Sequence, residues 1–158
     1  MDPFTELPYR LPGRVFRSAM PFSSFDPGGK LLDRYREEQV SVVVLLVSDE
    51  NCWIHSGRDL RSLYQDQDLT VIYLPIPDFG VPERDELERD VTAALGYSLE
   101  GKNIAIHCQA GIGRTGTFAA CLAKRTLGLT GDEAIVWVRQ WIRGGIETFD
   151  QEQLVRSF

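Results

Sequence analysis

The sequence predicts an α/β fold, a single domain in which helices flank a mostly parallel central sheet. Apolar β-branched runs alternate along the chain with amphipathic stretches of helical period, which is the pattern of strand–helix units. Residues 40–47 are apolar on both faces, as expected for a central strand that helices cover on both sides. The length of 158 residues suits one hydrophobic core.

The first half of the chain is expected to contain three strands and two helices. Residues 15–17 follow a Pro-Gly turn, and residues 40–47 and 69–74 are rich in β-branched residues, so all three segments are expected to be strands. Residues 30–39 carry leucines and a tyrosine at helical spacing among charges, and residues 56–67 repeat this spacing with a more polar surface. Both segments are expected to be helices.

The second half predicts one strand and four helices. Residues 82–99 begin with acidic residues and then place apolar residues on one face, which predicts a helix. Residues 104–106 are a short apolar strand that runs into a glycine-rich turn. Residues 114–127 predict a helix that ends at a glycine. A threonine is expected to cap another helix over residues 132–142, and residues 150–157 are expected to form the last helix.

Charge and hydropathy exclude two classes of partner. Seventeen Lys and Arg residues stand against 23 Asp and Glu residues, so the net charge is −6. General binding to nucleic acids or to anionic membranes needs a cationic surface, and we expect neither partner. No apolar run approaches the roughly 20 residues that a membrane-spanning helix requires.

The cysteines and histidines bear on location and on metals. Three cysteines cannot all pair within one chain and, with no secretion signal recognised, they favour a reducing, cytoplasmic setting. Two histidines and no Cys-x-x-Cys pattern exclude the usual zinc ligand sets, so no metal or other cofactor is expected. Residues 1–5 are typical of a cloning remnant, or a disordered end, and we place the domain at residues 6–158.

The segment after the strand at residues 104–106 carries the strongest motif, and two of its interpretations are weak. The pattern Gly-x-Gly-x-x-Gly at residues 111–116 matches a dinucleotide-binding turn, but that unit also needs a second strand and an acidic residue about 20 positions on. Here Asp132 begins a helix instead. A structural cysteine in a glycine-rich turn is the second interpretation, and it leaves Arg114 beside Cys108 unexplained.

The third interpretation is a phosphate-binding loop (P-loop) that contains a nucleophile. Five residues between Cys108 and Arg114 can curl into a half-ring, for which Gly111 and Gly113 permit positive φ angles. Inward N–H groups and the following helix N-terminus would favour both a thiolate and a bound phosphoryl group. The arginine fork can hold two oxygens at once. The backbone N–H groups expected to converge on the anion are those of Gln109, Ala110, Gly111, Ile112, Gly113 and Arg114.

Two neighbours complete this prediction. Thr115 can hydrogen-bond to the sulfur and help it to leave, and His107 is expected to brace the loop rather than to act as a base. Oxyanions such as phosphate, sulfate and vanadate should bind in the loop.

The stretch from His107 to Gly116, His-Cys-Gln-Ala-Gly-Ile-Gly-Arg-Thr-Gly, resembles the signature loop of the cysteine-dependent protein tyrosine phosphatase superfamily. Residues 128–135 and 146–153 resemble the small atypical dual-specificity phosphatases, so the resemblance covers roughly residues 12–158. It implies a metal-independent phosphomonoester hydrolase that forms a phosphocysteine intermediate. The chain departs from the family at residues 142–144, which read Ile-Arg-Gly where the family often has Arg-Pro-Gly.

Cleavage of a phosphate monoester also needs a proton for the leaving oxygen. Asp78 is the best candidate, because its loop follows a strand and should open on the same edge of the sheet as Cys108. It precedes the cysteine by thirty residues, as the acid of the resembled family does. The alternative is a solvated turn aspartate. For Gln151 the resemblance implies a residue that orients the attacking water, and the alternative is a surface glutamine near a helix start.

The variable loop positions Gln109, Ala110 and Ile112 are neutral, whereas relatives that act on phosphoinositides carry lysines there. A singly phosphorylated protein or a small phosphoester is therefore the expected substrate, with phosphotyrosine first and phosphoserine or phosphothreonine possible. Two other functions stay open. A catalytically weak phosphate-binding module would keep the loop, and a redox-active thiol protein would pair Cys108 with Cys52 or Cys121.

Overall fold

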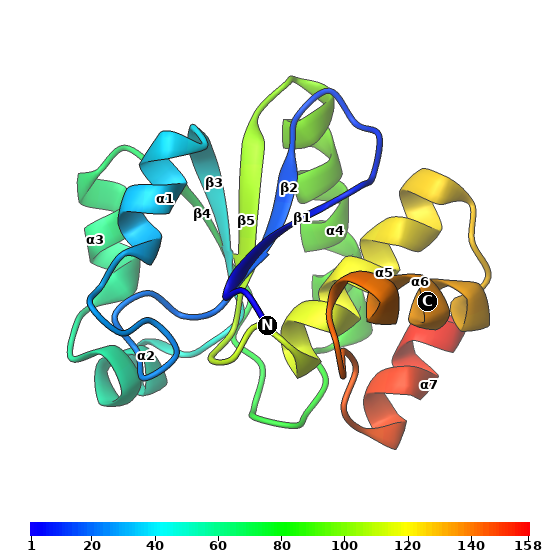
Figure 1. Ribbon diagram of the computed structural model, residues 1–158. Coiled ribbons are helices and arrows are strands. Elements are labelled where there is room, and N and C mark those ends of the chain that lie inside the picture. The colour runs from blue at the N-terminus through cyan, green and yellow to red at the C-terminus, as the bar shows by residue number, and fades with distance from the viewer.

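The computed structural model describes residues 1–158 and consists of one five-stranded sheet with helices on both faces (Figure 1). The strand order is β1-β2-β5-β3-β4, and only β1 runs antiparallel to its neighbour. This arrangement confirms the predicted α/β class. The strands are β1 (Phe4–Leu7), β2 (Val15–Ser18), β3 (Val40–Leu45), β4 (Thr70–Tyr73) and β5 (Asn103–His107).

Helices α1 and α3 cover one face of the sheet, and α4 and α5 cover the other (Figure 1). Helices α6 and α7 pack against α5 and against each other on the outside of that layer. None of the helices combines the length and the apolar character needed to cross a bilayer. The helices are α1 (Leu31–Glu37), α2 (Asp49–Ser56), α3 (Leu60–Asp66), α4 (Arg84–Leu99), α5 (Gly113–Leu127), α6 (Gly131–Trp141) and α7 (Phe149–Ser157).

The core is centred on β3, β5 and α5. Residues 42–46 and 104–106 are fully buried, because each strand has a neighbour on both sides and helices on both faces. Burying apolar surface contributes roughly 25 cal/mol per Å², so this continuous layer supplies most of the driving force for folding. It also fixes the ends of the central strands in space.

The helix expected over residues 56–67 is confirmed as α3, but it begins later, at Leu60, because residue 56 still belongs to α2. Ser56 ends α2, and Gly57 follows with a φ of 67°, a left-handed conformation that terminates the helix. Asp59 then caps α3 by accepting a hydrogen bond from the Ser62 N–H. Helix α2 was not expected, although Ser48 followed by two acidic residues is a typical helix start, and Ser48 does cap the helix.

Residues 1–5 were placed outside the domain, and the structure corrects this expectation. Phe4 and Thr5 lie in β1, which pairs with β2. The Phe4 ring is buried and stacks on Phe16 with ring centroids 4.6 Å apart, and Asp2 forms an ion pair with Arg34 at 2.7 Å. The sequence of these five residues alone could not predict this structure, because each of these side chains depends on a partner far away in the chain.

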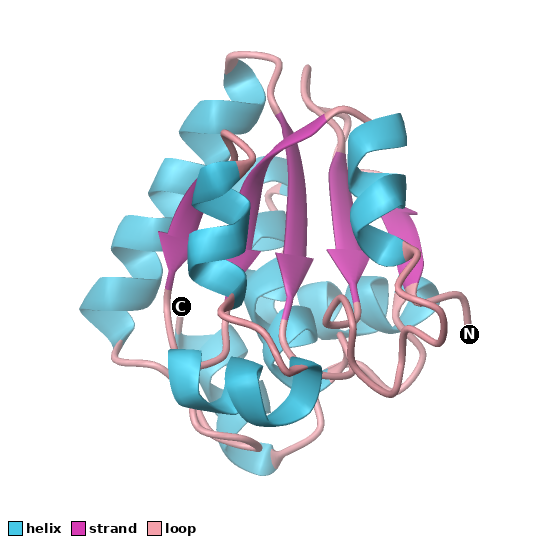
Figure 2. Cartoon of the chain, turned by 90° about the vertical axis from the view of Figure 1, so that its left-hand side faces the viewer, coloured by secondary structure: helices cyan, strands magenta, loops and turns pink.

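The carboxyl ends of β2, β3, β4 and β5 all point to one edge of the sheet (Figure 2). The loops that leave these strands therefore meet there. Sites in open α/β sheets lie at this edge because crossover loops there can bring residues from distant parts of the chain together.

Candidate active site

The P-loop, residues 108–114, connects β5 to α5 at this edge. Its flanks are held by the segments that follow β3 and β2, because the Leu46 N–H donates to the His107 carbonyl at 3.0 Å and the Met20 N–H donates to the Gln109 carbonyl at 2.9 Å. Cys108 is almost fully buried but borders a pocket that opens to the surface. The Thr115 hydroxyl donates to its sulfur at 3.2 Å, as predicted from the sequence.

The glycines of the loop act differently from our expectation. Gly111 has a positive φ of 75°, whereas Gly113 does not and begins α5. At Gly113 the missing side chain matters for space, because a Cβ atom there would lie 3.0 Å from the carboxyl carbon of Glu147. Gly116 is similar, since its Cβ would lie 2.9 Å from the backbone nitrogen of Ile146. These two glycines let the loop before α7 approach the P-loop.

His107 lies beneath the loop in a fully buried position. Its Nδ1 is 2.8 Å from the Cys108 carbonyl, which can only accept, so Nδ1 carries the proton and Nε2 accepts from the Tyr64 hydroxyl at 2.8 Å. Burial lowers the pKa of His107 to about 4, and the charge of Arg114 acts in the same direction. A neutral histidine with both nitrogens engaged fits the bracing role predicted for it.

Arg114 connects the P-loop to the Asp78 loop, residues 75–82. Its Nη1 donates to the Ile76 carbonyl at 3.0 Å, and its Nη2 forms an ion pair with Asp78 Oδ1 at 3.2 Å. The Arg114 side chain is 4% exposed and that of Asp78 is 56% exposed, so a buried cation meets a carboxylate at the surface. The structure thus brings the candidate acid Asp78 next to Arg114, although the two residues belong to different loops.

Gln151 lies at the start of α7 and is fully buried, so the alternative of a surface glutamine is wrong. Its Oε1 accepts from the Glu147 N–H at 2.8 Å, and its Nε2 donates to the Gly80 carbonyl at 3.1 Å. It also belongs to a capping box with Thr148. The side chain therefore ties α7 to the Asp78 loop beside the pocket, despite the departure at residues 142–144.

Glu147 is a site residue that the sequence analysis did not single out. It borders the pocket, and burial together with the nearby charge of Asp78 raises its pKa. The Arg114 charge and a hydrogen bond with the Gly113 backbone act in the opposite direction. The only signal was its place in the stretch 146–153, within which we had assigned a role to Gln151 alone.

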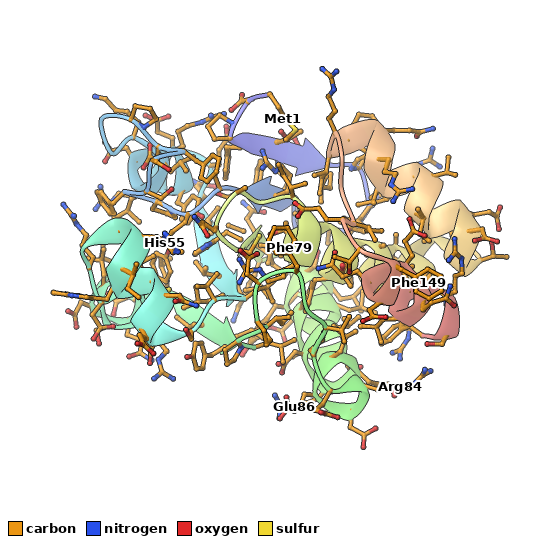
Figure 3. The ribbon with its side chains drawn as sticks, turned by 90° about the horizontal axis from the view of Figure 1, so that it is seen from below. Met1, His55, Phe79, Arg84, Glu86 and Phe149 are labelled. Carbon is orange, nitrogen blue, oxygen red and sulfur yellow. The ribbon has the colours of Figure 1, made fainter.

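These residues enclose a pocket of about 190 Å³. The floor is polar and the rim carries two exposed phenylalanine rings, Phe25 and Phe79. Figure 3 views this edge from below, with Phe79 near its centre and His55 and Phe149 to either side. Gly111 and Ile112 do not border the pocket. Its lining residues are Phe25, Asp78, Phe79, Cys108, Gln109, Ala110, Gly113, Arg114, Glu147 and Gln151.

A mostly parallel sheet with a cysteine between its central strand and the following helix is the fold of the cysteine-dependent protein tyrosine and dual-specificity phosphatases, which confirms the resemblance seen in the sequence. The match can be made more specific. The family model described as "Tc-R-P: Polymorphic toxin system, DSP-PTPase phosphatase" covers residues 26–127, and the chain belongs to this family.

Individual relatives agree with this class. Protein tyrosine phosphatase domain-containing protein 1 of Bos taurus is 36% identical over 81 residues, 51% of this chain and 10% of that protein. Tyrosine-protein phosphatase cdc-14 of Caenorhabditis elegans is 40% identical over 125 residues, 79% of this chain and 16% of that protein. The chain thus spans only a small part of these curated relatives.

Among solved structures, the crystal structure of Tk-PTP in the active form is similar over nearly the whole chain. The TM-score is 0.78 at 30% sequence identity, and the alignment covers 92% of this chain and 90% of that one.

Proposed function

We propose that this chain hydrolyses phosphomonoesters without a metal ion, through a phosphocysteine intermediate formed on Cys108. The observation that carries this proposal is the sulfur at the base of a small polar pocket, where it accepts a hydrogen bond from Thr115 and shares the pocket wall with the buried Arg114 guanidinium. Amides, a helix N-terminus and a guanidinium are the groups that bind a phosphoryl dianion and favour a thiolate.

In the first step the Cys108 sulfur attacks phosphorus, so an S–P bond forms as the P–O bond of the ester breaks. The leaving oxygen receives a proton from Asp78, and Arg114 with the backbone amides balances the charge on the other phosphoryl oxygens. The ion pair between Asp78 and Arg114 bears on this step. A phosphoryl group that binds to Arg114 in place of Asp78 releases the Asp78 carboxyl toward the leaving oxygen.

In the second step water attacks phosphorus, Asp78 takes a proton from that water, and the S–P bond breaks to regenerate the thiolate. Gln151 supports this step, because its side chain borders the pocket and its Nε2 donates one N–H to the Gly80 carbonyl, which leaves the second N–H of the amide to orient water. The hydroxyl of Thr115 stabilises the departing sulfur.

The substrate we propose is a singly phosphorylated protein or small phosphoester, with phosphotyrosine first. The Phe25 and Phe79 rings at the rim can pack on an aryl group. The pocket contains no lysine to hold a second phosphate, while Asp78 and Glu147 add negative charge. Both features favour one phosphoryl group per substrate.

The remaining cysteines argue against the redox alternative. Cys52 and Cys121 are free and fully buried, and burial raises the pKa of each thiol to about 12. Thiols of this kind are poor nucleophiles and exchange slowly. Three free cysteines also suit the cytoplasmic location that we propose for this chain.

Turnover of p-nitrophenyl phosphate and of a phosphotyrosine peptide, measured with a metal chelator present, tests this function. We expect turnover by the wild-type chain, competitive inhibition by vanadate, no turnover by Cys108→Ser, and normal turnover by the control Cys121→Ser. Activity that survives Cys108→Ser, or that the chelator removes, would overturn the mechanism. Binding of phosphate without any turnover would favour the phosphate-binding module instead.

A further inference from the structure

Arg17, near the end of β2, is a buried cation for which the proposed reaction has no use. It is 1% exposed and is among the largest fully buried side chains of the chain. Its three hydrogen bonds all go to backbone carbonyls: Nε to Gly111 at 3.1 Å, Nη2 to Ala110 at 2.8 Å and Nη1 to Asp2 at 2.6 Å. Removing a guanidinium from water is costly, so a buried arginine held by three fixed backbone acceptors indicates a specific structural role.

Two of these acceptors belong to the P-loop, and peptide geometry shows what holding them achieves. In a planar trans peptide the C=O of one residue and the N–H of the next point in opposite directions. Arg17 draws the Ala110 and Gly111 carbonyls toward β2, so the N–H groups of Gly111 and Ile112 turn the other way, toward the inside of the loop. These inward N–H groups belong to the nest of backbone amides that a bound anion would meet in such a loop.

The fit between arginine and loop is close. A Cβ atom at Gly111 would overlap Arg17 Nη2 and the Ser18 carbonyl, so the loop rests directly on β2. Burial lowers the pKa of Arg17, while the charges of Cys108 and Asp2 act in the opposite direction. The guanidinium keeps its charge at neutral pH, since arginine is not deprotonated in proteins. It therefore adds a fixed positive charge behind the nucleophile.

The third acceptor brings the N-terminal segment into the same network. The Asp2 carbonyl shares the guanidinium with the P-loop, and the chain start lies at the same edge as the loop after β5 (Figure 1). The Pro3 carbonyl next to it accepts from the Ala19 N–H at 2.8 Å. Strand β1 and its preceding residues thus support the active-site loop from behind.

We propose that Arg17 is a positioning residue, which turns the Gly111 and Ile112 amides toward the phosphoryl group without touching the substrate. The proposal rests on the proposed function of the same site. It assigns to β2 and to the N-terminal segment a part in anion binding that the motif from His107 to Gly116 does not contain.

The variants Arg17→Lys and Arg17→Met separate positioning from charge. Lysine keeps the charge but has no planar fork for two carbonyls, and methionine keeps neither. If positioning dominates, both should lower kcat by about 10- to 100-fold, as a small displacement of reacting groups does, with a smaller change in KM. The control is Arg14→Lys, because Arg14 precedes β2, is exposed, and its side chain hydrogen-bonds to Glu6 and Glu38 at the surface.

A second readout does not depend on turnover. The double variant Cys108→Ser/Arg17→Lys should bind tungstate more weakly than Cys108→Ser, by a factor similar to the loss in kcat. The pH midpoint of Cys108 alkylation by iodoacetamide should rise in the Arg17 variants. Wild-type levels of kcat and tungstate affinity in a folded Arg17→Lys would overturn the proposal, and so would failure of Arg17→Lys to fold. Absence of turnover by the wild type, with tungstate binding that still depends on Arg17, would overturn the proposed function alone.

Discussion

The P-loop and the Asp78 loop lie on opposite sides of one pocket and are built in different ways. The P-loop is buried and is held from below by His107, from β2 by Arg17 and from the adjacent loops by backbone hydrogen bonds. The Asp78 loop exposes the side chains of Asp78 and Phe79, and Phe79 adopts a positive φ of 61°. Its contacts with the rest of the site run through Arg114 and Gln151.

In the proposed mechanism this difference separates anion binding, by the P-loop, from proton transfer, by the Asp78 loop. An anion cradle works best when its dipoles are fixed before the substrate arrives, because no reorganisation is then needed during the reaction. An acid that must meet different leaving groups can lie on a loop with few buried contacts, since such segments open at low cost in free energy. The ion pair between Arg114 and Asp78 couples the two loops in the absence of substrate.

Replacing the proposed acid should remove proton donation by the Asp78 loop and leave anion binding by the P-loop intact. We expect Asp78→Asn to lower kcat by about 10²–10⁴ for alkyl phosphates, whose leaving groups need a proton, and far less for p-nitrophenyl phosphate. The fall in kcat at high pH should also disappear. Tungstate affinity should stay the same or increase, because Arg114 loses a competing carboxylate.

The measurement for Asp78→Asn is a pH–rate profile for both substrates, with Glu86→Gln as the control, since Glu86 is an exposed acidic residue in the first turn of α4. An unchanged profile would assign the acid to another residue.

Replacing Arg114, the residue that connects the two loops, should impair the function of both loops. We expect Arg114→Lys to lower kcat/KM by about 10²–10³, close to the effect of Arg114→Ala, because lysine cannot hold two phosphoryl oxygens or bond at the same time to the Ile76 carbonyl. Steady-state kinetics on a phosphotyrosine peptide measure kcat/KM, and Arg36→Lys, at an exposed position on α1, serves as the control. A kcat/KM within a few-fold of wild type would contradict a phosphoryl-binding role for Arg114.

His107, which supports the P-loop from below, should make the free energy of unfolding depend on pH. Burial lowers the pKa of His107 from 6.5 to about 4, so the unfolded chain binds this proton more readily than the folded chain between these pH values. The contribution is fully present above pH 6.5 and is lost as the pH falls toward 4. The shift corresponds to about 3 kcal/mol in the free energy of unfolding.

Urea unfolding at several pH values between 7 and 4 measures this contribution. His107→Asn should flatten the pH dependence, whereas His55→Asn should keep it, because His55 is exposed at the surface. Equal pH dependence in the wild type and in His107→Asn would rule out the buried neutral histidine.

The smallest expected effect concerns Glu147, which borders the pocket between the two loops. Glu147→Gln removes a carboxylate that faces the bound anion, and tungstate affinity should rise by roughly 2- to 10-fold. Since the pKa of Glu147 is raised, its protonated form gains weight as the pH falls, and the difference between wild type and variant should shrink. Calorimetry at pH 5 and pH 8 tests this, and a difference that grows toward low pH would contradict it.

The sequence predicted most of the fold because amphipathic spacing and caps are local signals. Helix α6 begins after Thr130 as expected, and the strand expected at residues 40–47 is the buried β3. One error came from a segment whose structure depends on distant partners, and the other from a local turn between two helices. Strand β1 exists because Phe4 packs on Phe16 and pairs along β2, and α2 is separated from α3 by a glycine turn that the helical spacing across residues 56–67 concealed.

The candidate site divides in the same way. The sequence alone pointed to the proposed nucleophile and its arginine, because Cys108 and Arg114 belong to one short loop whose chemistry follows from neighbouring residues. Only the tertiary structure decided that Arg114 pairs with Asp78, that Glu147 borders the pocket and that Arg17 supports the loop from 93 and 94 positions away in the chain. A local pattern can specify what a residue is able to do, but hydrogen bonds act over about 3 Å, and folding alone chooses which distant groups come that close.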